Sequence, residues 1–94
     1  MTSAITFSAT ANAVLYCGGD IRLLDIDPDT LAMTADGLGA ALKRTPEIEV
    51  VLPVHMAGYA ADMAALRKVA GDRTIIEDAS HALGGFYADG SAVG

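Results

Sequence analysis

The sequence is poor in residues on which several classes of protein depend. Its 94 residues include a single cysteine, Cys17. One cysteine excludes an internal disulfide and any metal site that is built from several thiolates. No apolar run reaches about 18 residues, so the sequence predicts no membrane-spanning helix. No charged segment precedes an apolar block, so no secretory signal is expected, and a reducing cytoplasm fits the cysteine content.

Basic residues are also scarce. Six Lys and Arg residues stand against twelve Asp and Glu residues, which gives a formal net charge of −6. An acidic chain without a basic cluster argues against nucleic acid as a partner. Apolar residues are plentiful at 52%, with a mean hydropathy of +0.38. A chain of this length therefore predicts one domain with one small core.

Two kinds of apolar segment alternate along the chain. Runs rich in β-branched residues predict strands at Thr2–Phe7, Ile21–Ile26, Glu49–Val54 and Arg73–Glu77. Apolar residues at helical spacing predict helices at Ser8–Cys17, Ala35–Lys43 and Ala60–Ala70. This alternation, with short connections, predicts an α/β fold that contains a parallel sheet.

A few residues refine these expectations. Ser8 or Thr10 is predicted to cap the first helix, and Thr34 the second. Pro53 has no N–H group, so we expect strand pairing to end there. Cys17 is expected to be a packing residue at the end of the first helix.

Ionisable side chains follow two of the predicted strands. His55 comes directly after Val54, and Asp78 follows the last strand, with His81 three residues later. Ligands of open parallel sheets bind at the carboxyl ends of the strands. Asp78 is therefore interpreted either as an acid that pairs with a protonated ring nitrogen or as a cap of the turn to Ser80.

Two further residues keep alternative interpretations. For His55, a hydrogen-bonded, half-buried structural residue is favoured over a catalyst. Phe7 is either a core aromatic or a platform on which a ring stacks, and composition favours the core.

Four short segments occur in a fixed order along most of the chain. They are Thr6–Ala13 (TFSATANA), Asp25–Thr30 (DIDPDT), Pro53–Gly58 (PVHMAG) and Glu77–Gly84 (EDASHALG). Together they resemble the DegT/DnrJ/StrS family of nucleotide-sugar aminotransferases, which are pyridoxal-phosphate enzymes of fold-type I. Leu15–Gly19 and Tyr59–Met63 are most similar to the branch that acts on UDP-4-keto-6-deoxy amino sugars, the UDP-4-amino-4,6-dideoxy-N-acetyl-altrosamine transaminases.

The resemblance implies roles for three residues. Asp78 matches the aspartate that pairs with the pyridine nitrogen of pyridoxal 5'-phosphate, which keeps the ring protonated and able to accept electrons. Phe7 matches the aromatic residue that stacks on the ring, and His81 stands where the family has Gln or His near the phenolic oxygen. His55 matches a family histidine, with no catalytic role assigned. Ser80 departs from the usual Glu-Asp-Ala-Ala block.

The resemblance also implies a fold and an activity. The fold is three-layer αβα, in which residues 1–94 form part of the parallel sheet of the large, cofactor-binding domain. Family members are several times longer, with an upstream phosphate-holding segment and a downstream lysine that binds the cofactor covalently. Neither Lys43 nor Lys68 has that lysine's context. The implied reaction transfers an amino group from an amino-acid donor, glutamate, to a keto-sugar nucleotide in a homodimer, and the chain alone is expected to be inactive.

Two other classes of function stay open at this point. One is a small α/β ligand-binding or interaction module without catalysis. The other is a metal-dependent hydrolase that uses His55, Asp78 and His81, although their spacing matches no strong zinc signature. Flanking sequence that encodes the phosphate segment and the lysine would favour the aminotransferase, whereas stoichiometric zinc would favour the hydrolase.

Overall fold

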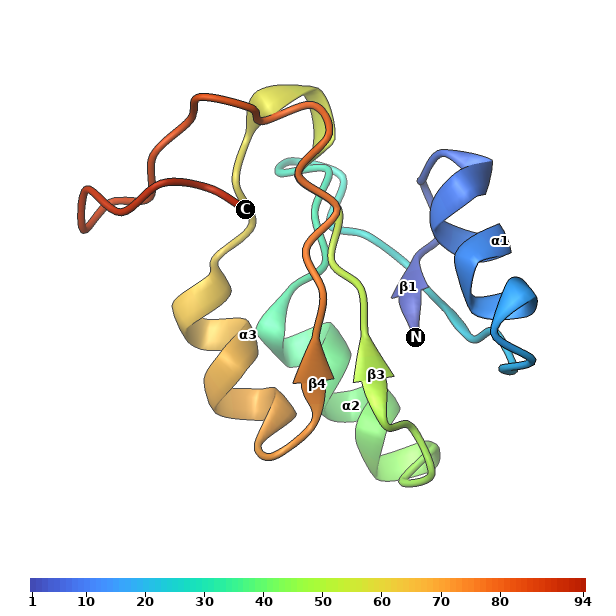
Figure 1. Ribbon diagram of the computed structural model, residues 1–94. Coiled ribbons are helices and arrows are strands. Elements are labelled where there is room, and N and C mark those ends of the chain that lie inside the picture. Colours follow the sequence, from blue (N-terminus) through green and yellow to red (C-terminus); the bar gives the residue numbers. More distant parts are fainter.

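Short β-branched runs form four strands that alternate with helices in the computed structural model, which describes residues 1–94 (Figure 1). The elements are β1 (Thr2–Ser3), α1 (Ser8–Tyr16), β2 (Leu23–Leu24), α2 (Ala35–Arg44), β3 (Val50–Val51), the 3-10 turn η1 (Met56–Gly58), α3 (Met63–Ala70) and β4 (Thr74–Ile75). Each predicted strand and helix is present, and the regular part of each strand is shorter than expected. No helix has the length and apolar character needed to cross a bilayer.

The strands are parallel and lie in an order that differs from the chain order. β1 pairs with β2, and β3 pairs with β4. A parallel bridge between Thr2 and Leu52 joins the two pairs, and the Leu52 N–H donates to the Met1 carbonyl at 2.8 Å. The spatial order is therefore β2-β1-β3-β4, and the direction of winding reverses between β1 and β3. The predicted parallel sheet is confirmed.

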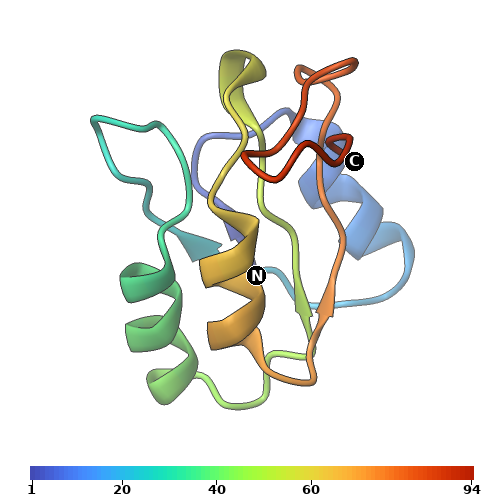
Figure 2. The ribbon, with the colours of Figure 1, turned by 90° about the vertical axis from the view of Figure 1, so that its left-hand side faces the viewer.

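The helices form two layers around the sheet. Figure 2 shows α2 and α3 side by side on one face of the strands and α1 on the other face. The core lies between the sheet and the α2–α3 layer, where Leu38, Val51, Leu66 and Ala70 have no exposed surface. This arrangement is the three-layer αβα fold that was expected.

The boundaries of α2 follow from its capping residue. The Thr34 hydroxyl accepts a hydrogen bond from the Gly37 N–H at 3.2 Å, as predicted, and satisfies one of the free donors of the first turn. Leu38 and Leu42 are buried on the core face. Lys43 and Arg44 in the last turn complement the negative end of the helix dipole.

The start of α3 differs from the prediction. The helix begins at Met63 rather than at Ala60, because the Asp62 carboxylate accepts from the Ala65 N–H at 3.0 Å and caps the first turn. Asp62 is exposed, and it is the N-cap of the helix rather than a residue within it. Met63 and Leu66 are buried, as the helical spacing indicates.

α1 corrects two expectations. Its N-cap is Phe7, with no side-chain hydrogen bond, so neither Ser8 nor Thr10 caps the helix. Thr10 is the buried residue of the helix, whereas Leu15 and Cys17 are exposed. The C-terminal end of the helix is thus uncovered, and the packing role predicted for Cys17 is wrong.

Strand pairing continues past Pro53, contrary to expectation. The Asp78 N–H donates to the Pro53 carbonyl at 2.9 Å, and the His55 N–H donates to the Asp78 carbonyl at 3.0 Å. Proline removes one donor from the ladder without removing its acceptor. The segment after β4 is therefore tied to the segment after β3 as far as Asp78.

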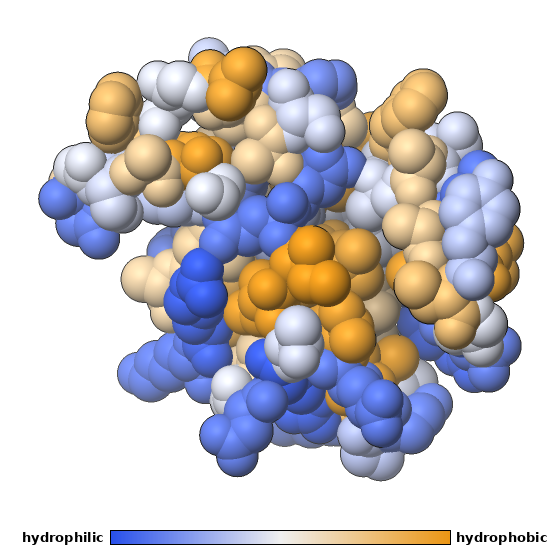
Figure 3. Space-filling model, in the orientation of Figure 1, coloured by the Kyte–Doolittle hydropathy of each residue, from blue (hydrophilic) through white to orange (hydrophobic).

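One face of the sheet lacks a helical cover over β3 and β4. Figure 3 shows apolar side chains gathered in the middle of this face. Ile76, which follows β4, is 54% exposed. β2 and β4 also keep one unpaired edge each, which leaves backbone donors and acceptors available along both margins of the sheet.

Candidate functional site

A pocket lies at the carboxyl ends of the strands, where the winding reverses. Its volume is about 310 Å³, near the lower end of the range for small-molecule sites. It is lined by Phe7, Ala9, Val54, Met56, Asp78, Ser80 and His81. The lining residues follow β1, β3 and β4, so the pocket occupies the topological switch point at which open α/β sheets bind ligands. Phe7, Asp78 and His81, the three residues selected from the sequence, all line it.

Asp78 is fixed by its backbone and by its side chain. The ladder hydrogen bonds to Pro53 and His55 hold its backbone. Its Oδ1 accepts from the Ser80 N–H at 3.2 Å and from the Ser80 hydroxyl at 2.7 Å, and its Oδ2 accepts from the Thr10 hydroxyl. The turn-capping interpretation is thus realised, together with a contact to α1 that the sequence did not indicate.

The surroundings of Asp78 favour its charged form. Partial burial opposes ionisation, but the hydrogen bonds from Thr10 and Ser80 and the nearby charge of His81 outweigh it, so the pKa of the Asp78 carboxyl is lowered. An ionised carboxylate only accepts hydrogen bonds and has about four acceptor positions. Three donors are already present, which leaves about one position for a ligand.

Phe7 and His81 are accessible from the pocket. The Phe7 side chain is 72% exposed, so the expectation that it belongs to the core is wrong. Phe7 is the N-cap residue of α1 and lines the pocket, where its exposed aromatic ring is available. His81 is exposed, and its charge acts on Asp78. The pocket therefore combines a carboxylate, an aromatic ring and an imidazole.

His55 takes no part in this pocket. It is completely buried, not half-buried, and its Nδ1 accepts from the Ala61 N–H at 3.1 Å. With Nδ1 as acceptor, Nε2 carries a proton and donates to Glu77 Oε2 at 3.1 Å. No three His, Cys, Asp or Glu side chains lie together so that they could hold a metal ion, and the set of His55, Asp78 and His81 is not assembled.

Glu77 organises a second cluster, which sequence reasoning missed. Its Oε1 accepts from Arg67 at 2.6 Å, and its Oε2 accepts from the Tyr87 hydroxyl and from His55. Burial opposes ionisation of Glu77, but hydrogen bonds from Tyr87 and His55 and the charge of Arg67 outweigh it and lower its pKa. Burial and the hydrogen bond to Glu77 raise the pKa of Tyr87 to about 12.

A sequence signal for this cluster does exist. Consecutive residues of a strand point to opposite faces of the sheet. If Asp78 faces α1, then Glu77 must face the α2–α3 layer, where a partly buried acid requires donors. The partners themselves are 10 and 22 residues away in sequence, and their identity depends on the three-dimensional fold.

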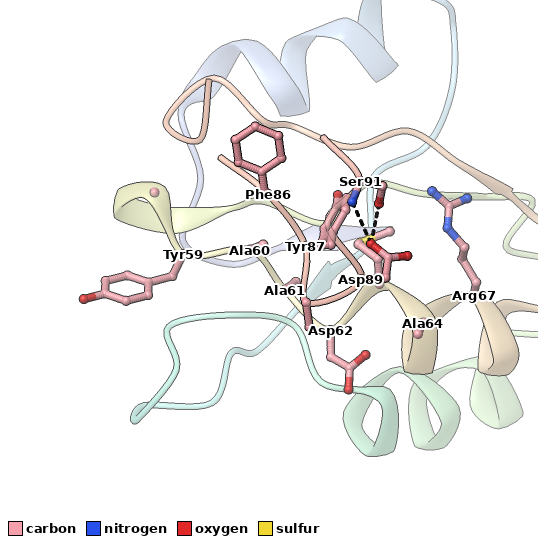
Figure 4. Close-up of a pocket in the computed structure, with 13 residues that line it drawn as sticks. Tyr59, Ala60, Ala61, Asp62, Ala64, Arg67, Phe86, Tyr87, Asp89 and Ser91 are labelled. Atoms are coloured by element: carbon pink, nitrogen blue, oxygen red, sulfur yellow. Dashed lines mark hydrogen bonds between the residues drawn. The ribbon is translucent and has the colours of Figure 1, made fainter. Parts of the chain in front are cut away.

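A larger hollow of about 800 Å³ lies between the segment around η1 and the segment Phe86–Ser91 (Figure 4). Three of its polar side chains are already engaged: the Ser91 hydroxyl donates to Asp89 at 2.6 Å, Arg67 is paired with Glu77, and Asp62 caps α3. Tyr59 and Phe86 point in different directions from its rim (Figure 4). The hollow presents no converging set of free polar groups, so the smaller pocket at Asp78 is the candidate site.

Comparison with known proteins gives consistent matches over the whole chain. The profile of the DegT/DnrJ/EryC1/StrS aminotransferase family matches residues 1–94. The structure is similar to 3-amino-5-hydroxybenzoic acid synthase, with 36% identity, a TM-score of 0.88 and coverage of 99% of this chain and 24% of that chain. It is also similar to the sugar aminotransferase CalS13 from Micromonospora echinospora, with 34% identity, a TM-score of 0.77 and coverage of 86% and 24%.

A third match carries a cofactor. The ntda protein from Bacillus subtilis, solved with bound cofactor PMP, has 39% identity and a TM-score of 0.74, and the match covers 83% of this chain and 18% of that chain. The chain thus spans about a quarter or less of the length of these solved structures.

Proposed function

Because the chain belongs to the DegT/DnrJ/EryC1/StrS aminotransferase family, we propose that residues 1–94 are a part of the large, cofactor-binding domain of an aminotransferase that uses pyridoxal 5'-phosphate. The α/β fold matches that of fold-type I enzymes. The observation that carries the proposal is the pocket at the switch point, in which an ionised Asp78 keeps about one acceptor position beside Phe7 and His81.

The residues of the pocket fit this cofactor. Asp78 would accept the N–H of the protonated pyridine ring, Phe7 would pack against the ring face, and His81 would act near the phenolic oxygen. When bound, the cofactor supplies an electron-accepting ring that stabilises a carbanion at the amino-bearing carbon. The chain's own part is to hold the ring and to keep its nitrogen protonated by placing a negative charge beside it.

The proposed substrates are those of the sugar aminotransferases. The amino group would come from glutamate and would pass to a keto-sugar nucleotide, within a cytoplasmic homodimer. CalS13, at 34% identity, is a sugar aminotransferase and supports this class. Leu15–Gly19 and Tyr59–Met63 support the UDP-4-amino-4,6-dideoxy-N-acetyl-altrosamine transaminase branch.

A second candidate is a ligand-binding module without catalysis. No lysine is among the residues that line the pocket, and Lys43 and Lys68 are exposed on α2 and α3. Without a lysine at the pocket, the cofactor has no covalent attachment there, so the isolated chain should hold it weakly and not transfer amino groups.

The test of the proposal is an assay of the protein encoded by the complete reading frame around these residues. Replacing Asp78 by Ala should cost about 3–4 kcal/mol of transition-state stabilisation, which is roughly 10²–10³-fold in turnover. Asp72→Ala, an exposed acid after α3, is the matched control and should leave turnover unchanged. Turnover near the wild-type value in Asp78→Ala would remove Asp78 from its role. A reading frame that does not encode the cofactor-binding lysine downstream would favour the ligand-binding module.

A further inference from the structure

Two hydroxyl groups hold the Asp78 carboxylate from opposite ends. The first belongs to Thr10, a buried residue of α1 that lies 68 residues away in sequence and donates to Oδ2. The second belongs to Ser80 in the turn that follows Asp78, and it donates to Oδ1 at 2.7 Å. We infer that Thr10 and Ser80 form a hydroxyl clamp, a pair of positioning residues that aim Asp78 into the pocket and keep it ionised there.

The inference deepens the proposed function and rests on it, because aiming Asp78 matters for catalysis only if a ring nitrogen meets it. Oδ1 already accepts from both the N–H and the hydroxyl of Ser80. Oδ2 accepts from Thr10 alone, so the remaining acceptor position is on Oδ2. A carboxylate with one free position suits a ligand with a single N–H donor, which is what a protonated pyridine ring offers.

The clamp also offsets the effect of burial. A carboxylate that loses water becomes a stronger base, and it could then take the proton of a ring nitrogen instead of pairing with it. Hydrogen bonds to the charged form act in the opposite direction and lower the proton affinity of Asp78. The clamp therefore favours the arrangement in which the proton stays on the ring and the charge stays on the carboxylate.

Few other charges face Asp78. His81, in the same segment, acts on it and favours its charged form. α1, the helix that supplies Thr10, has no acidic or basic residue. Glu77 and His55 are engaged with each other in the cluster on the other side of the sheet. The two hydroxyl groups and His81 are thus the neighbours that set the titration of Asp78.

The chain contains a natural control for this geometry. Asp89 and Ser91 repeat the spacing of Asp78 and Ser80, with a hydroxyl-to-carboxylate hydrogen bond of 2.6 Å and an N–H bond of 2.9 Å. Asp89 is exposed in a turn outside the pocket and has no second hydroxyl from a helix. Removing the Ser91 hydroxyl therefore deletes the same kind of hydrogen bond as removing the Ser80 hydroxyl, but at a site outside the pocket.

The experiment is a carboxyl-carbon NMR titration of the 94-residue chain, labelled at aspartate, in six forms: wild type, Thr10→Val, Ser80→Ala, the double variant that combines these two changes, Ser80→Thr and Ser91→Ala. Thr10→Val and Ser80→Ala should each move the Asp78 midpoint upward, with a larger move in the double variant. Ser80→Thr, which keeps a hydroxyl, should restore the wild-type midpoint. Ser91→Ala should move the Asp89 midpoint and leave Asp78 where it was.

Each outcome decides between the clamp and a merely structural turn. An Asp78 midpoint that stays in place in both hydroxyl deletions overturns the inference, as does a Ser80→Thr variant that behaves like Ser80→Ala. Addition of pyridoxamine 5'-phosphate to the same samples separates this result from the proposed function. If the hydroxyl deletions move the Asp78 midpoint as expected but the Asp78 carboxyl signal does not change when this probe is added, the inference about Asp78 stands and the result counts against the cofactor.

Discussion

The Glu77 cluster provides the sharpest prediction about stability. Glu77→Gln keeps the shape of the side chain, which is 11% exposed, and removes its charge. The amide can turn its oxygen toward Tyr87 and His55 and its NH₂ group toward Arg67, which is 60% exposed. The hydrogen bonds from Tyr87 and His55 then change from charge-assisted to neutral, and each change costs about 1 kcal/mol of stability. The solvent-exposed ion pair with Arg67, worth roughly 0.2–1 kcal/mol, is lost. We expect a loss of about 2–3 kcal/mol in the free energy of unfolding.

Urea unfolding followed by circular dichroism measures this loss. With a slope of about 1 kcal/mol per molar urea for a chain of this size, the midpoint should fall by roughly 2–3 M. The matched control is Glu49→Gln, which makes the same change at an exposed position without a side-chain hydrogen bond and should stay within about 0.5 kcal/mol of wild type.

The pH dependence identifies the cause of the loss. The pKa of Glu77 is lowered from its ordinary value of 4.5, so its contribution to stability is complete above that pH and disappears as the pH falls through the folded-state pKa. The stability gap between wild type and Glu77→Gln should therefore narrow in acid. A gap no larger than that of the control at neutral pH, or a gap that stays constant in acid, would refute the reasoning.

Three further predictions concern other parts of the chain. The pKa of Tyr87 is raised from 10.0 to about 12, so its contribution to stability is complete below pH 10 and is lost as the pH rises to about 12. Tyr87→Phe should therefore abolish this alkaline loss of stability. Urea unfolding at alkaline pH, with Tyr59→Phe as control, checks it. Thr34→Ala should cost about 1 kcal/mol and Thr34→Ser almost nothing, since serine keeps the cap, as thermal unfolding would show. Incubation with pyridoxal phosphate and borohydride should give no adduct concentrated at Lys43 or Lys68, because both are exposed and outside the pocket; peptide mapping that finds one dominant modified lysine would contradict this.

The helices illustrate what a single sequence can reveal about the fold. α2 was predicted almost to the residue, because Thr34 supplies a local capping signal and Leu38 and Leu42 a clear helical period. The position of α1 was predicted correctly, but the exposure of its residues was not. Periodicity shows that one face of a helix is apolar, but it does not show which segment covers that face. The start of α3 was misplaced because the capping role of Asp62 was not recognised from the sequence.

The candidate site shows the same division between local and long-range information. Because polar residues directly follow the last strand, the sequence placed Asp78 and His81 at the carboxyl ends of the strands. In the structure they line one pocket together with Phe7. The partners of these residues could not be derived in the same way. Thr10 and Asp78 are 68 residues apart in sequence, and His55 and Glu77 are 22 apart. These pairs are brought into contact by the fold of the whole chain, which no local pattern encodes.

The adjacency of Glu77 and Asp78 on alternate faces makes this strand sensitive to its length. Loss of one residue from the turn between α3 and β4 would advance the strand by one position against β3, which turns every side chain over. Asp78 would take the place of Glu77 beneath Arg67, Ala79 would take the place of Asp78 in the pocket, and both acids would meet the wrong neighbours. Surface turns usually tolerate insertions and deletions, whereas this one should accept only changes that preserve the alternation.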